Sequence, residues 1–184
     1  MFCISKIIKF LIKMFLVMLV FYAIFYAVTL FSWSDKHTSS DISNYNNLLN
    51  EVKNADEYMP SIEDFGAYDS LNISRKTTHS FMWNPVETVS IVVKYESSKF
   101  DEEKQKIYAN YSFLTYTTDS MLDINACVNG YDIMIVEMCD DYPKSFLAIG
   151  INEETHSIAY MFNYDFDIDT IKDLDDYIEK YYVL

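Results

Sequence analysis

The chain has 184 residues, of which 51% are hydrophobic, and its formal net charge is −14. Residues 1–33 carry three lysines and no acid, so the remainder holds 11 basic and 28 acidic side chains, a net charge of −17. A body this acidic repels phosphate backbones, which excludes nucleic acid as an expected partner and favours basic protein surfaces. The abundance of apolar and aromatic residues is typical of a folded protein and not of a disordered one.

The N-terminus holds the strongest single pattern, an uncharged apolar stretch over residues 14–33. Such a helix spans about 30 Å, the hydrocarbon thickness of a bilayer. We therefore predict that residues 1–33 form a basic cytoplasmic tip and a transmembrane anchor. Lys6, Lys9 and Lys13 precede the span, and the positive-inside tendency places the N-terminus in the cytoplasm and the acidic body outside. Trp33 is predicted to sit at the membrane interface.

An alternative for the same segment is a cleaved signal peptide. Residues 32–34 read Ser-Trp-Ser, a small-x-small pattern that follows a basic and apolar region. Cleavage near Ser34 would release a soluble secreted form. The apolar stretch is longer than the usual 7–15 residues of a signal peptide, which favours an uncleaved anchor.

The first elements of the body are predicted to be a polar stalk over residues 34–40 and a helix from Asp41 to about Ala55. Met59-Pro60 ends this helix, because the residue before a proline disfavours helical geometry. The helix is predicted from apolar residues that recur on one face, namely Ile42, Tyr45, Leu48, Leu49 and Val52.

The next elements alternate between strand and helix. Residues 88–95 are β-branched and predict a strand, and residues 100–111 predict a helix in which Glu102 pairs with Lys106. From residue 121 onward we predict a meander of strands with a tight hairpin turn at Asn129-Gly130, and a helix closes the chain. The fold class is therefore α+β. An N-terminal transmembrane helix precedes one domain, residues 41–184, with a mainly antiparallel sheet and about three helices.

The three cysteines do not predict a disulfide. Cys3 lies at the extreme N-terminus, and Cys127 lies beside the predicted hairpin turn. Cys139 would be on the order of 20 Å farther along the strand, whereas a disulfide needs Cα atoms within about 7 Å. We expect two buried thiols in the body.

The motifs of common catalytic and cofactor sites are missing from the sequence. The three glycines are far apart, which excludes a glycine-rich phosphate loop. The three histidines are isolated and no Cys-x-x-Cys occurs, which argues against zinc. We predict no catalytic residues, no cofactor and no enzymatic activity. The alternative is an enzyme acting on envelope material through a carboxylate pair that the sequence does not identify.

Residues 163–177, NYDFDIDTIKDLDDY, hold six aspartates and raise the question of a calcium site. Asp165, Asp167 and Asp169 fit positions one, three and five of a calcium loop, and Asp176 falls at position twelve. However, Thr170 stands where the loop requires glycine, and position twelve is usually a glutamate. The calcium site is therefore the less favoured interpretation, and we predict no metal site.

The preferred interpretation of this stretch is the exit of a strand followed by the start of the last helix. Asp165, Asp167 and Asp169 alternate with apolar residues and are predicted to lie on the solvated side of an extended segment. Asp169 or Thr170 is the predicted cap of the helix. Three further aspartates would then lie in its early turns, where the helix dipole favours negative charge: Asp173, Asp175 and Asp176.

Three blocks carry a resemblance to other proteins: DDYPKSFLAIG (140–150), SIAYMF (157–162) and NYDFDID (163–169). In these blocks the chain resembles uncharacterised small membrane-anchored exported proteins of low-GC Gram-positive bacteria. The resemblance covers roughly residues 57–170. It implies a cell-surface or envelope protein with a short anchor, and it carries no catalytic residues across.

Together these patterns predict a single-pass protein of the cell membrane, anchored in the bilayer through residues 14–33. The preferred function is a non-enzymatic binding or envelope-structural role, for example that of an immunity or inhibitor protein. The expected partner is a basic protein, and the sequence sets no oligomeric state.

Overall fold

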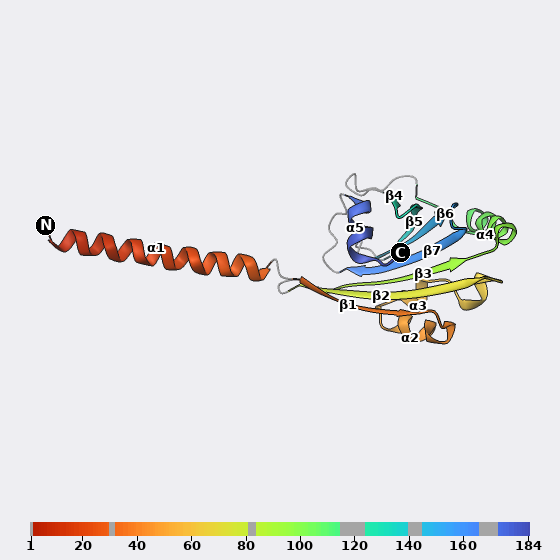
Figure 1. Ribbon diagram of the computed structural model, residues 1–184, viewed down its shortest axis with the longest axis horizontal. Helices are drawn as coiled ribbons and strands as arrows, with labels where there is room; N and C mark the ends of the chain where they lie inside the picture. The colour runs from red at the N-terminus through yellow and green to blue at the C-terminus, as the bar shows by residue number, and fades with distance from the viewer. Residues whose placement is uncertain (1, 30–31, 81–83, 115–123, 140–144, 166–172) are drawn as a thin grey trace.

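The computed structural model describes residues 2–29, 32–80, 84–114, 124–139, 145–165 and 173–184. The chain begins with a long helix, α1 (Phe2–Thr29), which extends away from a sheet-based domain (Figure 1). The strands of the domain are β1 (Ser32–Ser39), β2 (Ser70–Ser80), β3 (Val86–Lys94), β4 (Asn125–Val128), β5 (Tyr131–Cys139), β6 (Ser145–Asn152) and β7 (Ser157–Asp165). The remaining helices are α2 (Tyr45–Asn50), α3 (Ala55–Tyr58), α4 (Ser97–Asn110) and α5 (Leu174–Tyr181), with two 3-10 helices, η1 (Ile42–Asn44) and η2 (Ile62–Phe65).

The seven strands form one antiparallel sheet in the order β1-β2-β3-β7-β6-β5-β4. The predicted α+β class is therefore confirmed, and the described residues hold four α-helices besides α1, where about three were expected. The predicted strand at 88–95 is β3, and the predicted meander is β4 to β7. The hairpin at Asn129-Gly130 is also confirmed, because both residues have positive φ (52° and 80°), as a tight two-residue hairpin turn requires.

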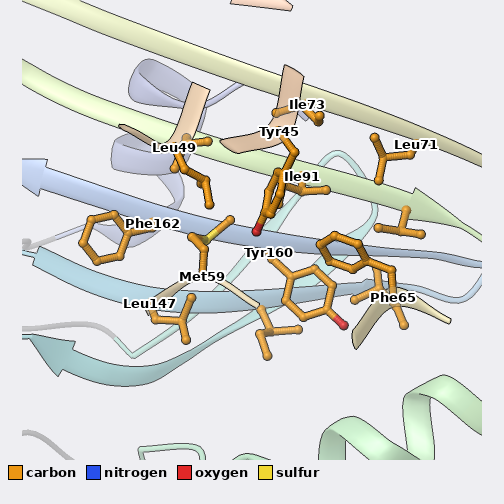
Figure 2. Close-up of a cluster of buried hydrophobic side chains, with 14 of the residues drawn as sticks. Tyr45, Leu49, Met59, Phe65, Leu71, Ile73, Ile91, Leu147, Tyr160 and Phe162 are labelled. Carbon is orange, nitrogen blue, oxygen red and sulfur yellow. The ribbon is translucent and has the colours of Figure 1, made fainter. Parts of the chain in front are cut away.

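Two layers cover the sheet (Figure 1). The α2 face is covered by residues 42–65, and α4 packs at the end of the sheet remote from α1. The α5 face is covered by α5 over strands β4 to β7. Figure 2 shows the core under the α2 face, where Tyr45 and Phe65 from the helical layer meet Tyr160 from the sheet. The Tyr45 and Phe65 rings meet edge to face, with centroids 5.8 Å apart.

The predicted helix over 41–55 is shorter than expected and is broken. The segment begins near Asp41 as predicted, but with the 3-10 helix η1, which Asp41 caps by accepting a hydrogen bond from the Ser43 N–H at 2.9 Å. The helix ends at Asn50, and Asn54 has a φ of 63° that separates α2 from α3. The predicted buried face is confirmed, since four of its five residues are fully buried: Tyr45, Leu48, Leu49 and Val52.

The predicted polar stalk at residues 34–40 is wrong. Residues 32–39 form β1, which pairs with β2 from Ser32↔Ser80 to Ser39↔Ile73. Neither strand has an apolar alternation along its whole length, and only the first part of β2 contributes apolar side chains to the core, Leu71 and Ile73. Arg75 of β2 fixes β1 further, since its guanidinium lies 3.3 Å from Asp35 and 3.4 Å from Glu51.

Candidate functional site

Helix α1 is long and apolar enough to cross a membrane by length and composition, although a signal sequence meets the same criteria. The apolar window is Leu11–Val28, and its side chains are exposed. Lys9 and Lys13 are also exposed, and both lie on α1. The helix ends at Thr29, so the predicted span of 14–33 is too long at its C-terminal end.

The helix joins the sheet over a short connection. Only two residues separate Thr29 from the start of β1 at Ser32, which limits the Cα separation of these residues to about 11 Å. Trp33 lies in this first part of β1, 50% exposed, and stacks on His79 of β2 with ring centroids 5.2 Å apart. The junction thus ties α1 directly to an edge of the sheet.

Glu103 is a buried carboxylate on α4, and two lysines of the same helix balance its charge. Its Oε1 lies 2.9 Å from the Lys106 ammonium and 3.2 Å from that of Lys99. The predicted pair of Glu102 and Lys106 is also present, at 3.2 Å. A Cβ at Gly66 would lie 2.9 Å from Glu103 Oε1, and the φ of Gly66 is +62°, so this turn requires glycine. Glu103 and its two lysines therefore pack α4 against the turn at Gly66, which precedes β2.

Asp165 is the second buried carboxylate, which corrects its predicted place on a solvated side. It is only 7% exposed, because α5 covers the opposite face of β7 as well. The Tyr177 hydroxyl donates to Asp165 Oδ2 at 3.2 Å, and the Asn163 amide donates to the same hydroxyl at 3.1 Å. Burial, followed by the charge of Asp165, raises the pKa of Tyr177 well above its ordinary value.

Helix α5 begins later than predicted. Its cap is Asp173, whose Oδ1 accepts from the Asp176 N–H at 3.1 Å, while Asp175 accepts from the Cys127 N–H at 2.9 Å. Asp175 and Asp176 lie in the first turn as expected. The predicted caps Asp169 and Thr170 lie outside the described residues.

The structure describes two of the four ligands of the alternative calcium site, Asp165 and Asp176. Asp167 and Asp169, two of its four proposed ligands, lie outside the described residues. Within the described part of the chain, no three His, Cys, Asp or Glu side chains are grouped so as to hold a metal ion. The Asp165 carboxylate accepts a hydrogen bond from Tyr177, whereas Asp176 takes part through its main-chain N–H, which donates to the Asp173 cap.

Cys127 is a free thiol, and it is exposed, contrary to the predicted burial. Its predicted place beside the hairpin turn is confirmed, because Cys127 pairs with Asp132 across the hairpin. Cys127 of β4 and Asp132 of β5 lie on the face of the hairpin opposite to Ala126 and Val128, which α5 covers. The side chain of Cys139 lies outside the described part of the structure.

The outer layer over the α2 face is strongly acidic. Between residues 41 and 69 the chain has one base, Lys53, and seven exposed acids: Asp41, Glu51, Asp56, Glu57, Glu63, Asp64 and Asp69. Three of the seven already have a structural role, since Asp41 and Asp64 cap helices and Glu51 pairs with Arg75. Among the described residues, no cation lies within ion-pair distance of the other four. We call residues 41–69 the acidic layer.

No match is found. Neither a family model, nor a curated protein, nor a solved structure matches this chain. Function must therefore be argued from these surfaces alone.

The sequence reasoning missed the two arrangements that bring charge together. The acidic layer was treated as an ordinary helix, although its excess of acid over base can be read directly from residues 41–69. Lys36 and Lys76 were not considered, because their strands were not predicted and their pairing across β1 and β2 was unknown.

Proposed function

We propose that this chain is a single-pass membrane protein whose α+β domain lies outside the cytoplasm and binds a basic protein partner through the acidic layer. The observation that carries the proposal is the charge of that layer. Four of its carboxylates are exposed with no described cation beside them: Asp56, Glu57, Glu63 and Asp69. Ile62 and Tyr68 are exposed within the same layer and supply apolar contact area.

The junction between α1 and β1 supports an uncleaved anchor. Cleavage near Ser34 would remove the first three residues of β1 and their pairing with Thr78, His79 and Ser80. It would also remove the stacking of Trp33 on His79. Only two residues lie between the end of α1 and the start of this strand. The same short junction holds the domain close to the membrane surface.

The two buried carboxylates support binding rather than catalysis. Glu103 lies on α4, which packs beside the turn that leads into β7, whereas Asp165 is the last residue of β7, so the length of this strand separates the two carboxylates. Each carboxylate contacts donors of its own, the lysines of α4 for Glu103 and Tyr177 for Asp165. A general acid and base working on one bond would have to face the same cleft. The proposed role of the domain is therefore recognition at the envelope.

Site-specific cross-linking in the producing cells tests the proposal. A photoreactive amino acid at position 57 or 63 should give a cross-linked product with a basic protein, because both positions lie in the acidic layer. The matched control is position 154, an exposed glutamate in the turn between β6 and β7. We expect the product to disappear at high ionic strength, since exposed charges are screened within about 10 Å at 0.1 M salt.

Charge reversal provides the second half of this test. Glu57→Lys combined with Glu63→Lys should abolish the product formed from a cross-linker at position 56, whereas Glu154→Lys should leave it unchanged. The same product from position 154, or a partner without a basic surface, would contradict the proposal.

A further inference from the structure

Three lysines gather where the C-terminal end of α5 meets strands β1 and β2. Lys36 and Lys76 are direct partners in the register of β1 and β2. Lys180 lies in the last turn of α5, and the Lys76 ammonium donates a hydrogen bond to its main-chain carbonyl. This carbonyl fixes Lys76 over the α5 face of the sheet. We call these three residues the lysine cluster.

No described carboxylate lies within 4 Å of any ammonium group in the lysine cluster, whereas four cations elsewhere in the described domain have such a partner. Arg75, Lys99, Lys104 and Lys106 each have a carboxylate within this distance. The contrast is informative because the domain holds far more acids than bases. Like charges directly opposite each other across two strands are destabilising, so the pairing of Lys36 with Lys76 costs stability in the absence of an anion.

The C-terminal end of α5 offsets only part of the positive charge of the lysine cluster. A helix C-terminus carries about half a negative charge, which the Lys76 ammonium alone offsets. Lys36 and Lys180 have no carboxylate partner among the described residues, and the Lys180 ammonium lies over the Tyr181 ring, 4.7 Å from its centroid. Desolvation lowers the pKa of Lys76, and the charges of Lys36 and Lys180 lower it further, which agrees with uncompensated repulsion.

The strand beside the cluster also offers unused hydroxyl groups. Ser74 and Thr78 lie two residues to either side of Lys76 and therefore on the same face of β2. Their hydroxyl oxygens are buried and have no hydrogen-bond partner in the structure. By contrast, the neighbouring hydroxyls of β3 are used, since Thr88 donates to the Tyr181 carbonyl and Ser90 to the Val183 carbonyl. Ser74 and Thr78 are about 13 Å apart along the strand, so one anion can use only one of them.

We propose that the lysine cluster binds a phosphate group. A phosphate carries up to two charges and several acceptor oxygens, which suits three ammonium donors better than a single carboxylate does. The phosphate group can come from inorganic phosphate or from the headgroup of an anionic phospholipid, and the chemistry of the site is the same for both. This site lies on the α5 face, whereas the acidic layer lies on the α2 face. The proposal of a phosphate site therefore does not depend on the proposed protein partner.

Thermal unfolding of the full chain in an uncharged detergent tests the site. Inorganic phosphate should raise the Tm in a saturable way relative to chloride at equal ionic strength. Lys36→Gln should weaken phosphate binding about tenfold, the loss expected for one charge-assisted contact. In phosphate-free buffer the same variant should have a higher Tm than the natural chain, because it removes the repulsion with Lys76. Lys104→Gln on α4 is the control and should leave phosphate binding unchanged.

Nanodiscs of phosphatidylglycerol and of phosphatidylcholine distinguish the two sources. If inorganic phosphate has no effect but phosphatidylglycerol raises the Tm of the natural chain and not of Lys36→Gln, the proposal holds with a lipid headgroup as the source. If inorganic phosphate raises the Tm and Lys36→Gln weakens its binding about tenfold, the proposal holds with free phosphate as the source. The proposal is overturned if neither ligand acts, or if both act equally on the natural chain and on Lys36→Gln.

Discussion

Above pH 10 the free energy of unfolding of this domain should fall steeply, by about 5 kcal/mol per pH unit. Five tyrosines have pKa values raised above the ordinary value of 10, with burial as the largest cause; the shift of Tyr111 is the smallest, and the four larger shifts belong to Tyr45, Tyr95, Tyr160 and Tyr177. In the unfolded chain these phenols lose their protons near pH 10, while in the folded domain they keep them. The folded state therefore binds more protons, and stability decreases as the pH rises.

The slope follows from the number of groups. Each tyrosine contributes about 1.4 kcal/mol per pH unit between its unfolded and folded pKa values. Because a domain of this size has a total stability of about 5–15 kcal/mol, we expect cooperative unfolding roughly between pH 11 and 13. Urea denaturation at pH 8 to 11.5, with phenolate absorbance recorded in parallel, measures both the stability and the ionisation.

A variant with one tyrosine fewer provides the control for this prediction. Tyr95→Phe should reduce the slope by about a quarter, at the cost of the hydrogen bond from its hydroxyl to the Phe65 carbonyl, 3.1 Å long. A free energy of unfolding that stays flat from pH 9 to 11.5 would contradict the buried state of these phenols.

The second large effect is expected from Phe65→Ala, which should lower the free energy of unfolding by about 3–5 kcal/mol. Phe65 is fully buried at the end of η2, and its ring packs against Tyr45 at 5.8 Å and Tyr160 at 5.6 Å between centroids. Truncation leaves a cavity between the helical layer and the sheet (Figure 2). Urea denaturation monitored by circular dichroism measures the loss.

Ile62→Ala is the matched control, because Ile62 begins the same 3-10 helix but is 38% exposed. It should cost less than about 1 kcal/mol. Equal and small losses for the two variants would mean that the acidic layer is not packed on the sheet as the structure shows.

The parts of the fold that the sequence predicted are those that bury apolar side chains in a regular period. Strand β3 and the β4 to β7 meander have apolar runs, and α4 has Phe100 and Ile107 on one face. Strands β1 and β2 could not be predicted in this way. Their pairing is held by backbone hydrogen bonds between polar segments some forty residues apart, such as Trp33 and His79.

The candidate site was harder to predict, because charge acts through spatial neighbours. Asp165 was expected on a solvated side, since alternation identifies only one buried face of a strand. Its burial depends on α5 covering the second face, which single-strand periodicity does not reveal. The lysine cluster depends likewise on the β1–β2 register and on the end of α5, which meet only in the folded chain.

Accessibility of single cysteines in intact cells tests the central claim, a membrane-anchored domain outside the cytoplasm, most directly. Two variants retain one thiol each, either Cys3 at the N-terminus or the exposed Cys127 in the domain, with the remaining cysteines changed to serine. A membrane-impermeant maleimide should label Cys127 in intact cells and Cys3 only after permeabilisation, and both proteins should remain in the membrane fraction. Labelling of Cys3 from outside, or of Cys127 only after permeabilisation, would contradict the proposed orientation. A mature chain beginning at Asp35 would contradict the anchor itself.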